Sequence, residues 1–147
     1  MKIREGRKED LPQVLELIKE LAEYVNALDQ VKNTVKNLKK DGFGKKPLYK
    51  IFVANDNKKI VGMGLLYYKY STWKGKRLYL EDLIVNYEYR RKGVGSKLFE
   101  TIIKFGKKNS CSGITLQVLD WNKIGINFYK KYNLQFDDEW LNCYLDF

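Results

Sequence analysis

The 147 residues are the length of one globular domain with a sizeable apolar core, since 44% of them are hydrophobic and 14% are aromatic. The chain contains no histidine, which excludes histidine-based catalytic triads, histidine general bases and histidine metal ligands. The net charge of +10 favours anionic partners, but the lysines are spread in pairs along the chain and predict a solvated surface rather than a specific nucleic-acid site.

The first part of the chain predicts one short strand and two helices. The strand runs from Met1 to Arg4. Apolar residues then recur with the period of a helix from Glu9 to Tyr24, where Pro12 is tolerated because it falls in the first turn. A shorter helix is predicted from Thr34 to Lys40, because Asp41-Gly42 is a helix stop signal.

Three strands follow in the middle of the chain. They are predicted at Tyr49 to Ala54, Ile60 to Tyr70 and Arg77 to Val85, all rich in β-branched and aromatic residues. Asp56-Asn57 separates the first two as a hairpin turn. This part therefore predicts antiparallel pairing.

The last part alternates helices with strands. Helices are predicted from Ser96 to Lys104 and Lys123 to Tyr132, and strands from Ile114 to Leu119 and Leu141 to Leu145. Hairpins followed by a β-α-β crossover predict a mixed α/β sheet with helices on both faces. No linker or repeat divides the chain, so we expect a single domain over residues 1–147.

A basic, glycine-containing turn between the third strand of the middle part and the next helix is a candidate anion site. Small residues let backbone N–H groups approach an anion, and the helix N-terminus adds its positive end. The spacing matches neither a P-loop nor the three-glycine dinucleotide fingerprint, so an ordinary basic turn remains the alternative. The turn consists of Arg90, Arg91, Lys92, Gly93, Val94, Gly95 and Ser96.

The number and spacing of the cysteines limit which disulfide or metal sites the chain is able to form. Cys111 and Cys143 lie far apart in the sequence and predict free thiols, and they do not have the paired spacing of a metal site. The N-terminus lacks an apolar signal segment, and no apolar run approaches the roughly 18 residues of a membrane span. We therefore expect a cytoplasmic protein with no metal and no membrane partner.

Four motifs in order resemble the GNAT N-acetyltransferase superfamily, and within it the diamine acetyltransferases of the spermidine/spermine and thialysine group. The resemblance covers nearly the full length. The motifs are Glu20-Leu21-Ala22-x-Tyr24, Asp41-Gly42-Phe43-Gly44, Tyr79-Leu80-Glu81-Asp82, and Trp121-Asn122 leading into Ile126-Asn127-Phe128-Tyr129-Lys130.

The resemblance implies a mostly antiparallel sheet of six to seven strands, and direct transfer of an acetyl group from acetyl-CoA to an amine in a ternary complex. It also implies a homodimer. Glu81 matches the family's general base, and Tyr129 its general acid for the leaving thiolate. From the residues alone, Glu81 is also explained as a solvated strand-end carboxylate or a partner of Arg77, and Tyr129 as a core aromatic.

The same resemblance implies a set of cofactor contacts. The strand backbone is expected to bind the pantetheine arm and the developing oxyanion, and the glycine turn the pyrophosphate. Asn122 is also explained as a helix N-cap. Besides Arg90 to Ser96, the expected contacts are Leu83, Ile84, Val85, Asn122, Lys123, Ile124, Gly125 and Lys131.

The acceptor amine is expected to meet acidic and aromatic side chains. Relatives tend to be acidic where this chain has Val25 and Ser71, so a thialysine-like amino-acid amine or a protein lysine stands beside the leading polyamine prediction. A non-catalytic module that binds acyl-CoA or nucleic acid is the remaining alternative. The expected substrate contacts are Tyr24, Trp73, Glu81, Asp82, Asp120 and Trp121.

Overall fold

The computed structural model describes all residues from 1 to 147, which form two compact units, Met1–Leu116 and Gln117–Phe147. The first unit is built on one sheet with the strand order β1-β2-β3-β4-β5. Neighbouring strands are antiparallel except β4 and β5, which are parallel. The mixed α/β class is thereby confirmed, with five strands instead of six or seven. The strands are β1 (Lys2–Glu5), β2 (Lys50–Asp56), β3 (Lys59–Ser71), β4 (Gly75–Val85) and β5 (Ile114–Leu116).

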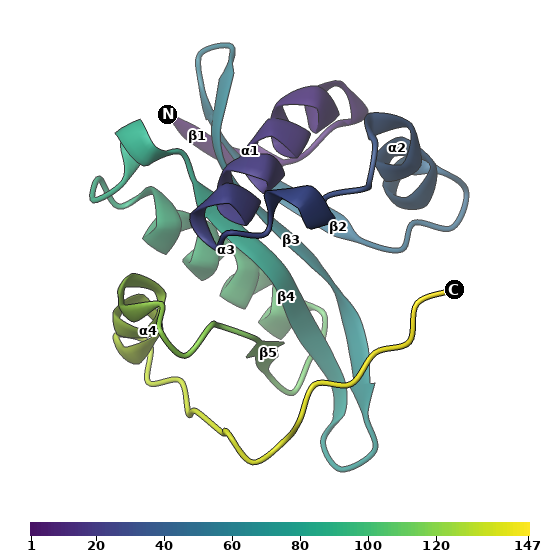
Figure 1. Ribbon diagram of the computed structural model, residues 1–147, viewed down its shortest axis with the longest axis vertical. Helices are drawn as coiled ribbons and strands as arrows, with labels where there is room; N and C mark the ends of the chain where they lie inside the picture. Colours follow the sequence, from purple (N-terminus) through teal and green to yellow (C-terminus); the bar gives the residue numbers. More distant parts are fainter. The chain divides into compact units, whose positions relative to one another are not determined.

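Helices cover both faces of this sheet, as predicted. Figure 1 shows α1 (Leu11–Tyr24) and α3 (Val94–Lys108) on opposite sides of the strands, while α2 (Val35–Phe43) lies near α1. Short 3-10 turns precede α1 at Lys8–Asp10 and α3 at Tyr87–Tyr89, and a third lies at Leu28–Gln30. None of the helices has the length and apolar character needed to cross a membrane.

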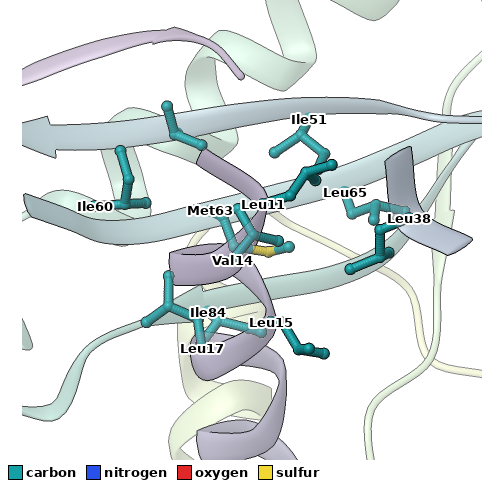
Figure 2. Close-up of a cluster of buried hydrophobic side chains, with 11 residues drawn as sticks. Leu11, Val14, Leu15, Leu17, Leu38, Ile51, Ile60, Met63, Leu65 and Ile84 are labelled. Carbon is teal, nitrogen blue, oxygen red and sulfur yellow. The ribbon is translucent and has the colours of Figure 1, made fainter. Parts of the chain in front are cut away.

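The apolar stripe of α1 builds the core on one face of the sheet. Leu11, Val14, Leu15 and Leu17 recur at helical spacing, and all are at most 9% exposed. Figure 2 shows these side chains against residues of β2, β3 and β4. Truncating one such leucine to alanine typically costs about 2–5 kcal/mol of stability. The strand residues of this cluster are Ile51, Val53, Ile60, Met63, Leu65 and Ile84.

Two glycines on the opposite face let α3 approach β3 closely. A Cβ at Gly62 would lie 3.1 Å from the Leu98 side chain, and one at Gly64 would lie 2.6 Å from that of Ile102. Because side chains alternate along a strand, Met63 between them faces the α1 core. This close packing fixes where the N-terminus of α3 stands beside the sheet.

Helix α2 runs through the glycine that was predicted to end it. The prediction of a stop at Asp41-Gly42 was wrong, since α2 continues to Phe43. Gly42 is buried against the ring of Tyr49, whose hydroxyl donates to the Leu38 carbonyl, and a Cβ at Gly42 would overlap this ring. The glycine is therefore required by tertiary packing and does not act as a cap.

The second unit contains one helix, α4 (Lys123–Lys130), which ends two residues before the predicted boundary at Tyr132. The predicted strand from Ile114 to Leu119 stops at Leu116, and the predicted strand from Leu141 to Leu145 is absent. Trp140, Leu141 and Tyr144 are 72–89% exposed. An apolar β-rich segment becomes a strand only when a neighbouring edge accepts its hydrogen bonds, and no strand pairs with this one.

Candidate functional site

The edge of β4 is open where the predicted motif Tyr79-Leu80-Glu81-Asp82 ends. Strand β5 pairs with β4 only up to Leu80, opposite Leu116. On the other edge, the register with β3 skips Glu81, which is the extra residue of a β-bulge between Leu80 and Asp82. A bulge bends the strand and redirects its side chains, so β4 leaves β5 at this point.

The open edge presents backbone donors from the end of β4. The Asn86 N–H donates to the Val61 carbonyl on β3, at 2.8 Å. Because alternate residues of an antiparallel strand direct their N–H and C=O groups to opposite edges, those of Leu83 and Val85 point to the open edge. Ile84 instead buries its side chain in the α1 core and pairs with β3. The geometry fits an extended ligand that hydrogen-bonds like an added strand.

Two carboxylates and a phenol gather at the bulge. The Tyr67 hydroxyl donates to Glu81 Oε1 at 3.1 Å, and Asp82 follows directly in the chain. We call Tyr67, Glu81 and Asp82 the carboxylate patch. Burial and the nearby Glu81 charge raise the pKa of Tyr67 to about 12, so its hydroxyl keeps its proton even in alkaline solution. The sequence prediction missed Tyr67, because only the β3–β4 register brings it to Glu81.

Asp82 differs from Glu81 in its surroundings. Glu81 is exposed, whereas Asp82 is partly buried, and no lysine or arginine forms an ion pair with it. Burial and the charge of Glu81 raise the pKa of Asp82 to about 6. A carboxylate with such a pKa changes charge close to neutral pH, which is typical of functional sites.

Arg77 was the alternative partner for Glu81, and the structure gives it other partners. Its Nε donates to Thr115 Oγ1 at 2.9 Å and its Nη2 to the Ile114 carbonyl at 3.1 Å. Arg77 therefore joins β4 to β5, and Glu81 stays exposed beside Tyr67.

The glycine turn has the backbone shape of an anion site. Arg91 and Gly93 both have positive φ, +61° and +78°, and α3 begins at Val94 with no side-chain cap on its first N–H groups. The backbone N–H groups of Val94, Gly95 and Ser96 are therefore available to a ligand. A Cβ at Gly93 would meet nothing within 4 Å, so glycine is required there by its φ and the space around the turn is open.

The basic residues of the turn divide into two groups. Arg91 and Lys92 are exposed, and the ammonium of Lys92 lies 5.4 Å from the Tyr89 ring centre. Arg90 is turned back toward β4, where its Nε donates to the Val85 carbonyl at 3.0 Å. Its guanidinium lies 5.5 Å from the ring centre of Tyr24, a predicted substrate contact at the end of α1.

Trp73 is not brought to the carboxylate patch. It lies in the turn between β3 and β4 and is 86% exposed. At ~3.3 Å per residue, the stretch of β4 from Gly75 to Glu81 alone spans roughly 20 Å. Glu81 and Asp82 therefore lie near one end of the β3–β4 hairpin, and Trp73 lies at its other end.

The predicted residues of the second unit cluster around α4. Asn122 Oδ1 accepts the Gly125 N–H at 3.1 Å, which confirms the N-cap interpretation. Tyr129 is 9% exposed, with its ring 5.2 Å from that of Phe128. Asp120 and Trp121 form the turn before the helix. Of the remaining predicted contacts, Lys123 and Ile124 are exposed in the first turn of α4 and Lys131 is exposed at its end.

Comparison with a family model and with known proteins shows the family of this chain. Residues 13–133 match the model of the acetyltransferase (GNAT) family. The chain is 43% identical to a thialysine N-epsilon-acetyltransferase of Bos taurus, over 90% of this chain and 83% of that protein. It is 37% identical to a human spermidine/spermine N(1)-acetyltransferase-like protein 1, over 86% of this chain and 19% of that longer protein.

A solved structure shares the fold. An aminoglycoside acetyltransferase from an uncultured soil metagenomic sample superposes with a TM-score of 0.80 at 21% identity, covering 99% of this chain and 95% of the other. Because the family model matches residues 13–133, which is most of the chain, the chain belongs to the acetyltransferase (GNAT) family, whose members use acetyl-CoA as co-substrate.

Proposed function

We propose that this enzyme acetylates the terminal primary amine of a small, lysine-like aliphatic substrate. The observation that carries the proposal is the carboxylate patch at the open edge of β4, one short loop before the glycine turn. An acid-lined position beside a binding edge for acetyl-CoA attracts an ammonium group to the place where the acetyl group is delivered.

The residues of the first unit support a consistent cofactor position. Acetyl-CoA supplies the activated acetyl thioester. We assign its pantetheine arm to the N–H groups of Leu83 and Val85, and its pyrophosphate to the turn from Arg91 to Ser96. The second unit is proposed to add contacts from Asn122 to Gly125 and from Lys131.

The acceptor must lose a proton before it can attack, because a free alkylammonium has a pKa of about 10.4. Glu81 is proposed as the proton acceptor, directly or through water, since it is exposed and held by the Tyr67 hydroxyl. Ionised Asp82 adds negative charge that stabilises the incoming ammonium. Tyr129 is proposed to donate a proton to the departing thiolate.

The choice of amine follows from the charges. The patch has two carboxylates, enough for one ammonium, and the net charge of +10 opposes the approach of a tri- or tetracation. The thialysine N-epsilon-acetyltransferase of Bos taurus named above supports a substrate with its own carboxylate. A polyamine is the second candidate, supported by the adjacent acidic side chains and by the human spermidine/spermine-type relative.

A homodimer belongs to the same proposal. The tail of the second unit exposes Trp140, Leu141, Tyr144 and Leu145, each at least 72% accessible, which is unusual for a monomer's surface. Light scattering on the purified protein is expected to give twice the chain mass, and a monomer mass would contradict this part.

The test is thiol release from acetyl-CoA with thialysine, lysine, spermidine, putrescine and a lysine peptide. We expect the largest kcat/KM with thialysine or lysine. Glu81→Gln and Tyr129→Phe should each lower kcat by about 10²- to 10⁴-fold while acetyl-CoA still binds. Turnover of the peptide alone would contradict the small-molecule assignment, and full activity in both variants would contradict the assigned roles.

A further inference from the structure

One carboxylate of α1 holds the loop between β4 and the glycine turn. Glu20 Oε1 accepts the Tyr87 N–H at 2.9 Å, and its Oε2 accepts Asn86 Nδ2 at 3.2 Å. The Arg90 guanidinium lies 3.8 Å from the same carboxylate, and the Glu20 side chain is only 29% exposed. A single side chain thus contacts three residues of the loop from a different element.

Arg90 completes this arrangement from the other side. Its guanidinium lies near two rings, 5.5 Å from the centre of Tyr24 and 5.6 Å from that of Tyr87. Its Nε bonds the Val85 carbonyl, a group of the open β4 edge. Arg90 therefore links α1 to the last residue of β4. We call Glu20, Tyr24, Asn86, Tyr87 and Arg90 the Glu20 clamp.

Asn86 forms three hydrogen bonds with its backbone N–H and its side-chain amide. Its N–H donates to Val61 on β3, its Oδ1 accepts the Glu88 N–H at 3.2 Å, and its Nδ2 donates to Glu20. The loop is therefore held against both α1 and the sheet. These bonds set the distance between the β4 edge and the glycine turn that begins a few residues later.

We propose that Glu20 is a positioning residue for acetyl-CoA, and that Arg90 acts within the Glu20 clamp rather than as a phosphate ligand. The inference rests on the proposed function, which places the pantetheine arm on the β4 edge and the pyrophosphate on the glycine turn. A ligand that spans both sites binds well only if the loop between them keeps its shape.

The partners of Arg90 argue against a phosphate role. Moving its guanidinium to a phosphate would leave the Glu20 carboxylate without its cation and the Val85 carbonyl without a donor, and each loss is costly in a partly buried position. Arg91 and Lys92 are exposed at the same turn and meet a phosphate without breaking such contacts.

The first test separates cofactor binding from chemistry. Glu20→Ala should raise KM for acetyl-CoA about tenfold while kcat changes by less than about twofold. Glu20→Gln keeps oxygen for the Tyr87 N–H and should recover part of the loss. Glu23→Ala is the matched control, since Glu23 is an exposed carboxylate on the same helix and forms no ion pair. A fall in kcat with KM unchanged in Glu20→Ala would overturn the proposal.

The second test is a double-mutant cycle with acetyl-CoA. Arg90→Gln should raise KM for acetyl-CoA, and adding Glu20→Ala should bring little further loss because both act through one clamp. Arg91→Gln should also raise KM, but its loss should multiply with that of Glu20→Ala, because Arg91 lies outside the clamp. If the losses of Arg90→Gln and Glu20→Ala multiplied as well, Arg90 would act independently of the clamp, as a phosphate ligand, and the proposal would be wrong.

Amide hydrogen exchange distinguishes failure of this inference from failure of the proposed function. The Tyr87 amide should be protected in the wild-type protein and lose about tenfold or more of its protection in Glu20→Ala. Absence of acetyl-CoA binding by the wild-type protein would refute the proposed function, and the role of the clamp with it. Normal cofactor binding, with Tyr87 protection and KM both unchanged in Glu20→Ala, would refute the clamp alone.

Discussion

Asp10, before α1, is buried, and Asp82, directly after the bulge residue Glu81 in β4, is partly buried, but their surroundings have opposite effects on the carboxyl pKa. Asp10 is 8% exposed and accepts two bonds from Arg4, at 2.8 and 3.0 Å, and one from the Arg7 N–H at 2.7 Å. Burial raises the pKa of Asp10, but the bonds from Arg4 and Arg7 and their charges outweigh it, so the pKa lies below its ordinary value.

Asp82 has no neighbouring cation or hydrogen-bond donor that offsets the effect of burial on its pKa. Burial and the charge of Glu81 both act in the same direction, and its pKa rises to about 6. The charge of Asp10 is therefore stabilised by the fold, whereas the charge of Asp82 is held at a cost. This contrast separates a carboxylate that joins β1 to the start of α1 from one that we propose meets a cationic substrate.

The two residues make opposite contributions to stability as pH changes. For Asp10, whose pKa is lowered, the stabilisation is present above its ordinary pKa of 3.8 and is lost as pH falls through the folded value. For Asp82, whose pKa is raised, the folded state binds more protons between about pH 4 and pH 6. Stability therefore falls as pH rises through this window.

The largest effect is expected from breaking the Asp10 pair. Asp10→Ala should lower the free energy of unfolding by about 3 kcal/mol, because Arg4 keeps its charge in a position only 16% exposed. Urea unfolding at pH 7 measures the loss. The control is Glu5→Ala, which removes the exposed Glu5–Lys50 pair and should cost less than about 1 kcal/mol. Equal effects of the two variants would contradict the assignment of Asp10 as a structural carboxylate.

Asp82→Asn should lower activity and raise stability. With the amide in place of the carboxylate, kcat/KM for the amine is expected to fall about tenfold or more. The free energy of unfolding at pH 8 should rise by on the order of 1 kcal/mol, since the uncompensated charge is removed. Thermal unfolding at pH 8 and pH 4 tests this, because the gain should vanish at pH 4. A variant less stable than wild type at pH 8 would show that the fold needs the Asp82 charge.

The pH dependence of turnover sharpens the same point. The ratio of kcat/KM between wild type and Asp82→Asn should be constant above about pH 7 and fall toward one as pH drops through about 6, where Asp82 takes up a proton. Taking the ratio cancels the ionisation of the amine itself. Initial rates from pH 5 to pH 8 at constant ionic strength provide the measurement, and a ratio independent of pH would rule out ionised Asp82 in substrate binding.

The smallest expected effect is at Tyr67. Tyr67→Phe removes the hydroxyl bonded to Glu81 and keeps the ring, so kcat should fall about fivefold with the free energy of unfolding changed by less than about 1 kcal/mol. Tyr68→Phe is the control, because Tyr68 lies on the other face of β3, stacked on Phe105. Equal kinetics for the two variants would show that Tyr67 does not hold Glu81.

The sequence by itself determined most of the first unit. The period of its apolar residues identified α1 and α3, and the β-rich runs identified β2, β3 and β4. The predicted ends of each element lie within a few residues of the observed ends. The glycine turn was also visible, because a chain needs small residues wherever backbone N–H groups must stay open. Such features depend on near neighbours in the chain.

Only the tertiary structure decided which groups meet. Tyr67 reaches Glu81 through the register of β3 and β4, the Glu81 bulge comes from one extra residue in that register, and Arg90 finds Glu20 through the packing of α1. The segment from Leu141 to Leu145 has the composition of a strand, but it is not a strand of the sheet, because forming one requires a strand edge to accept its hydrogen bonds. Residue type and spacing determine which elements a segment is able to form, whereas hydrogen-bond partners far apart in sequence are selected by how these elements pack.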